Sequence, residues 1–280
     1  MGTSSSKRDA PPAAPLVPPW ADQDPVPPPV LDPETPPPLP ADALPNHPVA
    51  APELPPAEVA PPRRYAAFRS ALRRFAAGGD AGEARAALGH WARTSAGGSR
   101  AGTARVARAA RTGGAALAGF ARAGAGQPPV PGALDVRSLA GLPIEAAIER
   151  IVDAFCPSGI LDEDTARIAI GEALATALAG VDTFDPNAAD AHAVGVATLT
   201  FAAELVFMQV AGDGGRALAA APSPVDAAQR EADLRSLVHE VTDLLGTPIL
   251  AAAGAVLTPE GMASLVSRLV EVVESEMETW

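Results

Sequence analysis

The sequence has one cysteine, Cys156, and few aromatic residues, which make up 4% of its 280 positions. A single cysteine excludes an internal disulfide. Scarce aromatic residues argue against β-sandwiches and barrels, and abundant alanine favours closely packed helices. The start lacks the basic, apolar and small-residue series of a signal peptide, and the nearest approach to a membrane span, residues 193–203, is short of about 18 residues. We therefore expect a cytoplasmic protein that does not enter a membrane.

Sequence patterns typical of enzymes and metal sites are also absent. There is no Walker loop, dinucleotide fingerprint or nucleophile elbow, and the four histidines are too scattered for a metal motif. The acids at 162–164 lack the glycine and spacing of a calcium loop, so we interpret Asp162 or Asp164 as a helix cap. Cys156 is interpreted as a small buried hydrophobe. The sequence thus predicts a protein that is not an enzyme, with no metal and no cofactor.

Charge and proline divide the chain into segments. Residues 1–62 carry two basic and eight acidic side chains, residues 63–126 carry twelve arginines and two acids, and the remainder carries seven arginines and 23 acids. Most of the 31 prolines precede residue 63. We predict a disordered Ser/Pro-rich arm at 1–62, a basic helical region at 63–126, a linker at 127–134 and an acidic all-α bundle at 135–280.

The arm has two features that suggest recognition by partners. Gly2 is small enough for Met1 to be removed, which leaves a primary amine whose unperturbed pKa is about 7.7–8.0. Trp20 lies in a proline-rich stretch with no core to enter, so it is either an anchor for a partner groove or an isolated exposed tryptophan. The candidate docking residues are Leu16, Val17, Pro18 and Trp20.

The basic region is expected to form three helices. Tyr65, Phe68, Leu72 and Phe75 give the first an apolar face, Asp80 and Glu83 form a capping box for the second, and a break at 95–102 precedes a third that Gly113 and Gly114 interrupt. Its arginines could contact a polyanion such as DNA, although we favour a solvated face or pairing within the chain. The candidate contacts are Arg63, Arg64, Arg69, Arg73, Arg74, Arg105, Arg108 and Arg111.

The acidic bundle is expected to contain five helices. The first follows Pro143 and the second bears Ile168, Ile170, Leu174 and Leu178 on its apolar face. The third, near 187–211, is the most apolar and should be central. The fourth begins at Ser223 and is stopped by Gly246, and the last begins at Thr258.

Several stretches together resemble the QatB family, the non-enzymatic component of bacterial Qat anti-phage defence operons. They are residues 1–6, 15–22, 85–98 (RAALGHWARTSAGG), 151–165 (IVDAFCPSGILDEDT), 183–187 (TFDPN) and 276–280 (EMETW). None of them is a catalytic signature. The resemblance depends on their joint occurrence and order.

The resemblance implies an operon that also encodes an ATPase, a QueC-like enzyme and a TatD-like nuclease. QueC-like enzymes of defence operons are associated with joining a deazaguanine-type base to an N-terminal glycine of a partner. By this resemblance Gly2 would be modified, and Thr3, Ser4, Ser5 and Ser6 would thread the enzyme's active site. The body would dock on the ATPase, and contact with the nuclease would be indirect. A DNA-binding adaptor and a pure assembly scaffold with an unmodified tail are the alternatives.

Overall fold

The computed structural model describes residues 65–94, 99–156 and 161–280, with side chains from Val106 onward in the third helix and from Asp164 onward in the fifth. The predicted arm at 1–62 therefore lies outside the described residues. Residues 58–280 form one compact unit. Helices account for its regular structure, and no strand occurs in the described part of the chain, which confirms the all-α prediction there. The helices are α1 (Ala66–Ala76), α2 (Ala81–Thr94), α3 (Ser99–Gly124), α4 (Ile144–Phe155), α5 (Leu161–Ala177), α6 (Ala191–Gly214), α7 (Pro224–Ala253) and α8 (Pro259–Glu278), with short 3-10 turns η1 (Val136–Leu139), η2 (Pro186–Ala188) and η3 (Gly215–Ala220).

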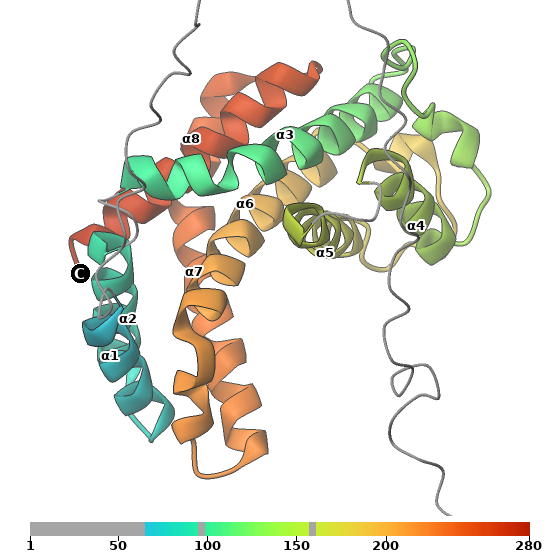
Figure 1. The fold of residues 1–280 in the computed structure, drawn as a ribbon. Coiled ribbons are helices and arrows are strands. Elements are labelled where there is room, and N and C mark those ends of the chain that lie inside the picture. The colour runs from blue at the N-terminus through green and yellow to red at the C-terminus, as the bar shows by residue number, and fades with distance from the viewer. Residues whose placement is uncertain (1–64, 95–98, 157–160) are drawn as a thin grey trace, which may run out of the picture. The chain divides into compact units, whose positions relative to one another are not determined.

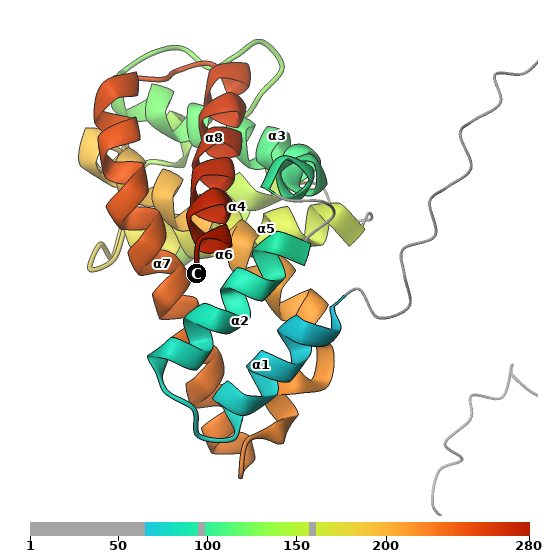
Figure 2. The same ribbon diagram turned by 90° about the vertical axis from the view of Figure 1, so that its left-hand side faces the viewer.

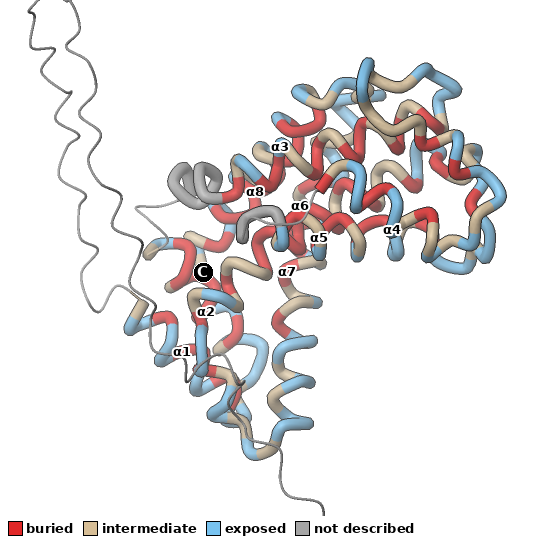
Figure 3. Tube along the Cα trace, turned by 45° about the vertical axis from the view of Figure 1, so that its right-hand side comes forward, coloured by how far each residue is buried: buried red, intermediate tan, exposed pale blue. Residues whose placement is uncertain are grey.

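The helices pack around α6. Figure 1 shows α3 and α8 side by side across the unit, α1 and α2 as a hairpin at one end, and α4 and α5 at the other. The hairpin of α1 and α2 packs against η3, where α6 turns into α7, as Figure 2 shows from the side. Buried residues concentrate along α3, α6 and α8 (Figure 3). The core is thus shared between the basic and the acidic parts of the chain.

The first helical hairpin follows its apolar pattern closely. Phe68, Leu72 and Phe75 are buried along α1, as their spacing predicts. Asp80 caps α2, because its Oδ1 accepts hydrogen bonds from the backbone N–H groups of Gly82 and Glu83. Glu83 does not complete the predicted capping box and instead accepts a hydrogen bond from Arg74 Nε at 3.0 Å. The hairpin is therefore joined by a surface ion pair.

The third helix corrects two expectations. It begins at Ser99, within the predicted break at 95–102, and it runs through Gly113 and Gly114 to Gly124 without interruption. A Cβ on Gly113 would overlap the Phe201 ring, and one on Gly114 would lie 2.7 Å from the backbone N of Ala263. These glycines allow α3 to approach α6 and α8 closely. Packing therefore outweighs the low helix propensity of glycine here.

The acidic helices keep their predicted starts but differ in two places. Ser223 and Thr258 accept hydrogen bonds from backbone N–H groups at the starts of α7 and α8, as predicted. Gly246 does not stop α7, which continues through Pro248 to Ala253, because Gly246 fits beneath the ends of Leu199 and Leu269. Asp162 and Asp164 lie inside α5 rather than at its N-cap.

The apolar pattern of α5 was wrong at one residue. Ile170, Leu174 and Leu178 are buried, whereas Ile168 is 58% exposed. Positions 168 and 170 are about 200° apart on a helix, so they cannot both face the core. Leu244 on α7 is likewise 75% exposed, although the predicted face included it.

The most apolar segment is the central helix, as predicted. By length and composition, Ala191–Ala220 could cross a membrane, and 67% of its most apolar window is buried among the other helices. This burial is typical of the core helix of a globular unit. Its length exceeds the short apolar run of the sequence analysis because the span includes Glu204 and Asp213.

Candidate functional site

Many of the residues singled out in the sequence lie outside the described residues. They are Gly2, Thr3, Ser4, Ser5, Ser6, Leu16, Val17, Pro18, Trp20, Arg63 and Arg64. Arg105 lies in α3, but its side chain is not among those described. The remaining candidates, Arg69, Arg73, Arg74, Arg108 and Arg111, are exposed on α1 and α3.

Several arginines of the basic helices are engaged within the unit. Arg69 Nε donates to the carbonyl oxygen of Asp213 at 2.8 Å, and its guanidinium lies 5.8 Å from the Tyr65 ring centroid. Arg93 Nη1 donates to the carbonyl oxygens of Glu278 and Trp280 at 2.7 and 2.8 Å. Each bond holds one of the first two helices to another element. The cationic surface offered to a partner is thus smaller than twelve arginines suggest.

Arg108 and Arg111 remain as exposed cations on α3. Together with Arg105 they follow a spacing of three residues, which places the three positions along one side of the helix. Arg111 borders a groove of about 730 Å³ between α3 and α8. This side of α3 is the part of the predicted polyanion contact that the described surface presents.

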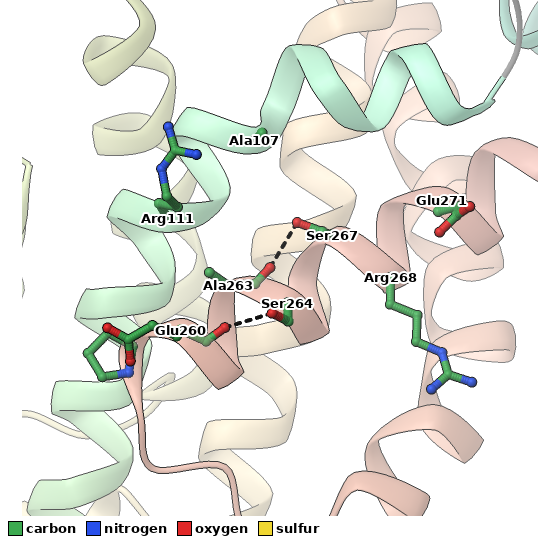
Figure 4. A pocket seen from close by; sticks show the side chains of 9 residues that line it. Ala107, Arg111, Glu260, Ala263, Ser264, Ser267, Arg268 and Glu271 are labelled. Carbon is green, nitrogen blue, oxygen red and sulfur yellow. Dashed lines mark hydrogen bonds between the residues drawn. The ribbon is translucent and has the colours of Figure 1, made fainter.

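The groove between α3 and α8 has a floor of small side chains and a rim of both charges (Figure 4). Ala107 and Ala263 form part of its lining, and Ser264 and Ser267 donate their hydroxyl protons back to carbonyls of α8. Its charged residues are Arg111, Glu260, Arg268 and Glu271. Because cations and carboxylates alternate along the rim, the groove does not present the single-sign surface that a polyanion needs.

A buried polar cluster joins α6 to α7. Glu204 is 1% exposed, and its Oε1 lies 2.8 Å from His239 Nε2 and 3.6 Å from Arg235 Nε. The Arg235 guanidinium also lies 4.7 Å from the Phe207 ring centroid. Burial raises the pKa of the Asp243 carboxyl, one turn beyond His239, and the nearby histidine partly offsets this. A buried carboxylate needs such partners, so the cluster fixes how α7 lies on α6.

An apolar cavity of about 640 Å³ lies where α3 and α7 end and α6 and α8 begin. Its walls are alanines, glycines and aliphatic side chains, among them Val194, Leu250, Val256 and Leu265. Asp190 is the one charged side chain in this lining, and it also caps α6 by accepting from the Ala193 N–H at 2.8 Å.

No group of three or more His, Cys, Asp or Glu side chains in the described part of the chain could hold a metal ion. Asp185 serves turn chemistry, as predicted, because its Oδ1 accepts from both the backbone N–H and the side-chain amide of Asn187. Cys156 is buried, as predicted. The described side chains therefore offer binding surfaces and packing, and the sequence-predicted arginines are not gathered around one catalytic point.

Comparison with known families gives a match over much of this unit. A family model described as Qat anti-phage system associated protein QatB matches residues 97–272, well over half of the chain. The chain belongs to the QatB family. Comparisons with curated proteins and with solved structures find no match.

Membership of the QatB family makes this protein a component of an anti-phage defence system. The matched residues span α3 to most of α8, so they include both the groove and the apolar cavity. The family is thus defined on the helical body, whereas Gly2 and Trp20 precede the matched range.

Sequence analysis missed the buried cluster and the cavity. Glu204 alone carries charge within the apolar stretch from 191 to 212, and this isolation was a usable signal that a partner exists on another helix. Arg235 and His239 are four residues apart on one helix face, which is the matching signal. The cavity left no such signal, because its lining comes from the ends of four helices that are distant in sequence.

Proposed function

We propose that this QatB family member is a non-enzymatic scaffold whose N-terminal glycine, freed by removal of Met1, is conjugated to a deazaguanine-type base by a QueC-like enzyme of the same operon. The helical body docks on the operon's ATPase, and the TatD-like nuclease is engaged indirectly. The complex acts in the cytoplasm without a cofactor of its own. The single observation that carries the proposal is membership of the family, since it places the chain in a Qat system.

Features of the chain support this assignment. Gly2 is followed by Thr3 and three serines, whose small side chains suit passage through an enzyme's active site. The segment from there to residue 62 is rich in proline, and such linkers act as semi-rigid spacers of about 3.1 Å per residue. A spacer of this kind would let the tip reach an enzyme while the body stays docked. The amine of Gly2 is less basic than lysine, so a larger fraction is nucleophilic near neutral pH.

Mass spectrometry of the N-terminal peptide tests the proposal. The protein is purified from cells that carry it alone and from cells that carry the full operon. We expect an added nucleobase mass on Gly2 only with the full operon, and a Met-trimmed, unmodified terminus without it. An unmodified terminus in both samples contradicts the proposal.

Variants of Gly2 separate conjugation from assembly. Gly2→Leu should abolish both the adduct and phage protection, because a bulky residue hinders Met1 removal and entry into the active site. Gly78→Ala, at a surface turn of the body, is the matched control and should keep the adduct. Intact conjugation and protection in Gly2→Leu would sink the conjugation hypothesis. Lost adduct with intact protection would favour the pure assembly scaffold.

The DNA-binding adaptor is the second candidate function, favoured by the exposed pair Arg108 and Arg111 on α3. It predicts affinity for DNA that falls steeply with salt.

A further inference from the structure

The apolar cavity at the ends of α3 and α7 has the character of a site for a protein side chain. Small-molecule and cofactor sites combine apolar walls with several polar groups that fix the ligand's orientation. Here the two threonines of the lining use their hydroxyl protons within their own helices: Thr198 donates to the Val194 carbonyl at 2.7 Å and Thr247 to the Asp243 carbonyl at 2.7 Å. The cavity therefore offers an aliphatic surface with almost no donors.

Asp190 supplies the charge at this site. Its Oδ1 accepts the Ala193 N–H, and its Oδ2 has no hydrogen-bond partner among the described residues. Asp190 is exposed, so a cationic group can reach that oxygen from solvent.

The surroundings of the cavity are acidic as well. Asp182 and Asp185, on the loop that leads to α6, are exposed, and residues 127–280 carry 23 acids against seven arginines. Arg122 is the cation closest in sequence to the lining of α3, and it donates to the carbonyls of Pro128 and Leu257. The field at the cavity mouth thus favours a positively charged partner.

We propose that this cavity receives an aliphatic side chain from a partner protein, on a segment that places a lysine or arginine beside it to meet Asp190. Buried apolar anchors with a charged neighbour are a common way for protein interfaces to combine affinity with orientation. A lipid acyl chain would gain little from Asp190, because a neutral chain carries no charge to pair with it. The proposal names the partner by its chemistry alone, and it holds whether or not Gly2 is conjugated.

Site-specific crosslinking tests this proposal in cells that carry the full operon and are infected with phage. Ala251, which lines the cavity and is exposed, is replaced by a diazirine amino acid; Ala175, exposed on α5 outside the cavity, receives the same group as a control. We expect Ala251, but not Ala175, to crosslink to a protein segment that mass spectrometry shows to hold an aliphatic residue beside Lys or Arg. Absence of a crosslink above the control overturns the proposal. A crosslink to lipid or to an acidic segment overturns it too.

Two variant pairs identify the interaction that gives the crosslink. Gly195 lies in the wall, and a Cβ there would make only an ordinary contact of 3.8 Å with Leu250, so Gly195→Leu fills the cavity while Gly195→Ala barely changes it. We expect the crosslink to be lost in the first and kept in the second. Asp190→Asn keeps an N-cap but removes the charge, and it should lower the yield by about two- to fivefold, since an exposed ion pair contributes roughly 0.2–1 kcal/mol.

Equal yields in Gly195→Leu and Gly195→Ala would overturn the cavity as the site. An unchanged yield in Asp190→Asn would overturn the basic partner. The Gly2 adduct, measured in the same cells, is expected to be unaffected by these variants. Failure of the cavity proposal is thereby distinguished from failure of conjugation.

Discussion

At the scale of single residues, the unit places its few buried charges where two helices meet. Glu204 is held by His239 and Arg235, so a carboxylate in an otherwise apolar helix has partners from α7 alone. Removing one partner of a buried pair costs more than the pair contributes, because the remaining charge stays desolvated. The cluster therefore specifies the register of α6 on α7 more than it adds stability.

Asp243 gives a pH dependence whose sign follows from its desolvation. Its raised pKa means that the folded state holds the proton more tightly than the unfolded chain, so ionisation of Asp243 opposes folding as pH rises. We expect Asp243→Asn to raise the free energy of unfolding at pH 7, by less than about 1 kcal/mol because the group is exposed. The gain should vanish below about pH 3.9, where aspartate is protonated in both states.

Urea denaturation of both proteins at a series of pH values measures this difference. Glu240→Gln, also exposed on α7, is the control and should show no comparable gain. Equal stability of Asp243→Asn and the parent at pH 7 would contradict the prediction.

At the scale of helices, glycine fixes which elements can touch. Gly113 and Gly114 remove the side chains that would separate α3 from α6 and α8, and Gly246 does the same for α7. A glycine in a helix is thus a packing position here, whereas periodicity and propensity alone make it a boundary.

The pair Gly113 and Gly212 tests this role. Both glycines lie within helices, but a Cβ on Gly113 would overlap the Phe201 ring while one on Gly212 would meet open space. We expect Gly113→Ala to lower the free energy of unfolding by about 1–3 kcal/mol through overpacking. Gly212→Ala should raise it by up to about 1 kcal/mol through helix propensity. Chemical denaturation measures both, and similar effects of the two substitutions would refute the packing explanation.

Sequence reasoning predicted these helices well where a cap or an apolar period was present. Ser223, Thr258 and Asp80 marked true helix starts because side-chain caps act locally. It failed at Gly113, Gly246 and Ile168, where the outcome depends on which neighbour lies opposite. The candidate site was predictable only as far as the arginines of α1 and α3, because the cavity is assembled by the tertiary fold.

At the scale of the whole molecule, the basic helices and the acidic ones build a common core. The union of α3 with α8 and of the α1–α2 hairpin with η3 shows this directly. Arg69 and Arg93 donate to carbonyls of the acidic part, which consumes cations that a polyanion would require. We expect DNA binding by the body to be weak.

Replacing Arg108 and Arg111 by glutamine tests the DNA-adaptor hypothesis at this scale. If it holds, the double variant should reduce the slope of log affinity against log salt by about 2, since each lost phosphate contact removes about 0.9. The control is Arg150→Gln together with Arg216→Gln, two exposed arginines outside the basic helices. Fluorescence anisotropy with a labelled duplex at several salt concentrations gives the slopes. An unchanged slope in the first variant would remove these helices as a DNA contact.

The pairing of α3 with α8 also has a consequence for biosynthesis. The two helices lie side by side, yet α8 leaves the ribosome long after α3, and such distant pairings are slow to form. Until α8 arrives, the alanine and glycine face of α3 has no partner, so a nascent chain needs protection along it. Met1 and Gly2 emerge first of all, and processing enzymes therefore meet the terminus before the body has closed.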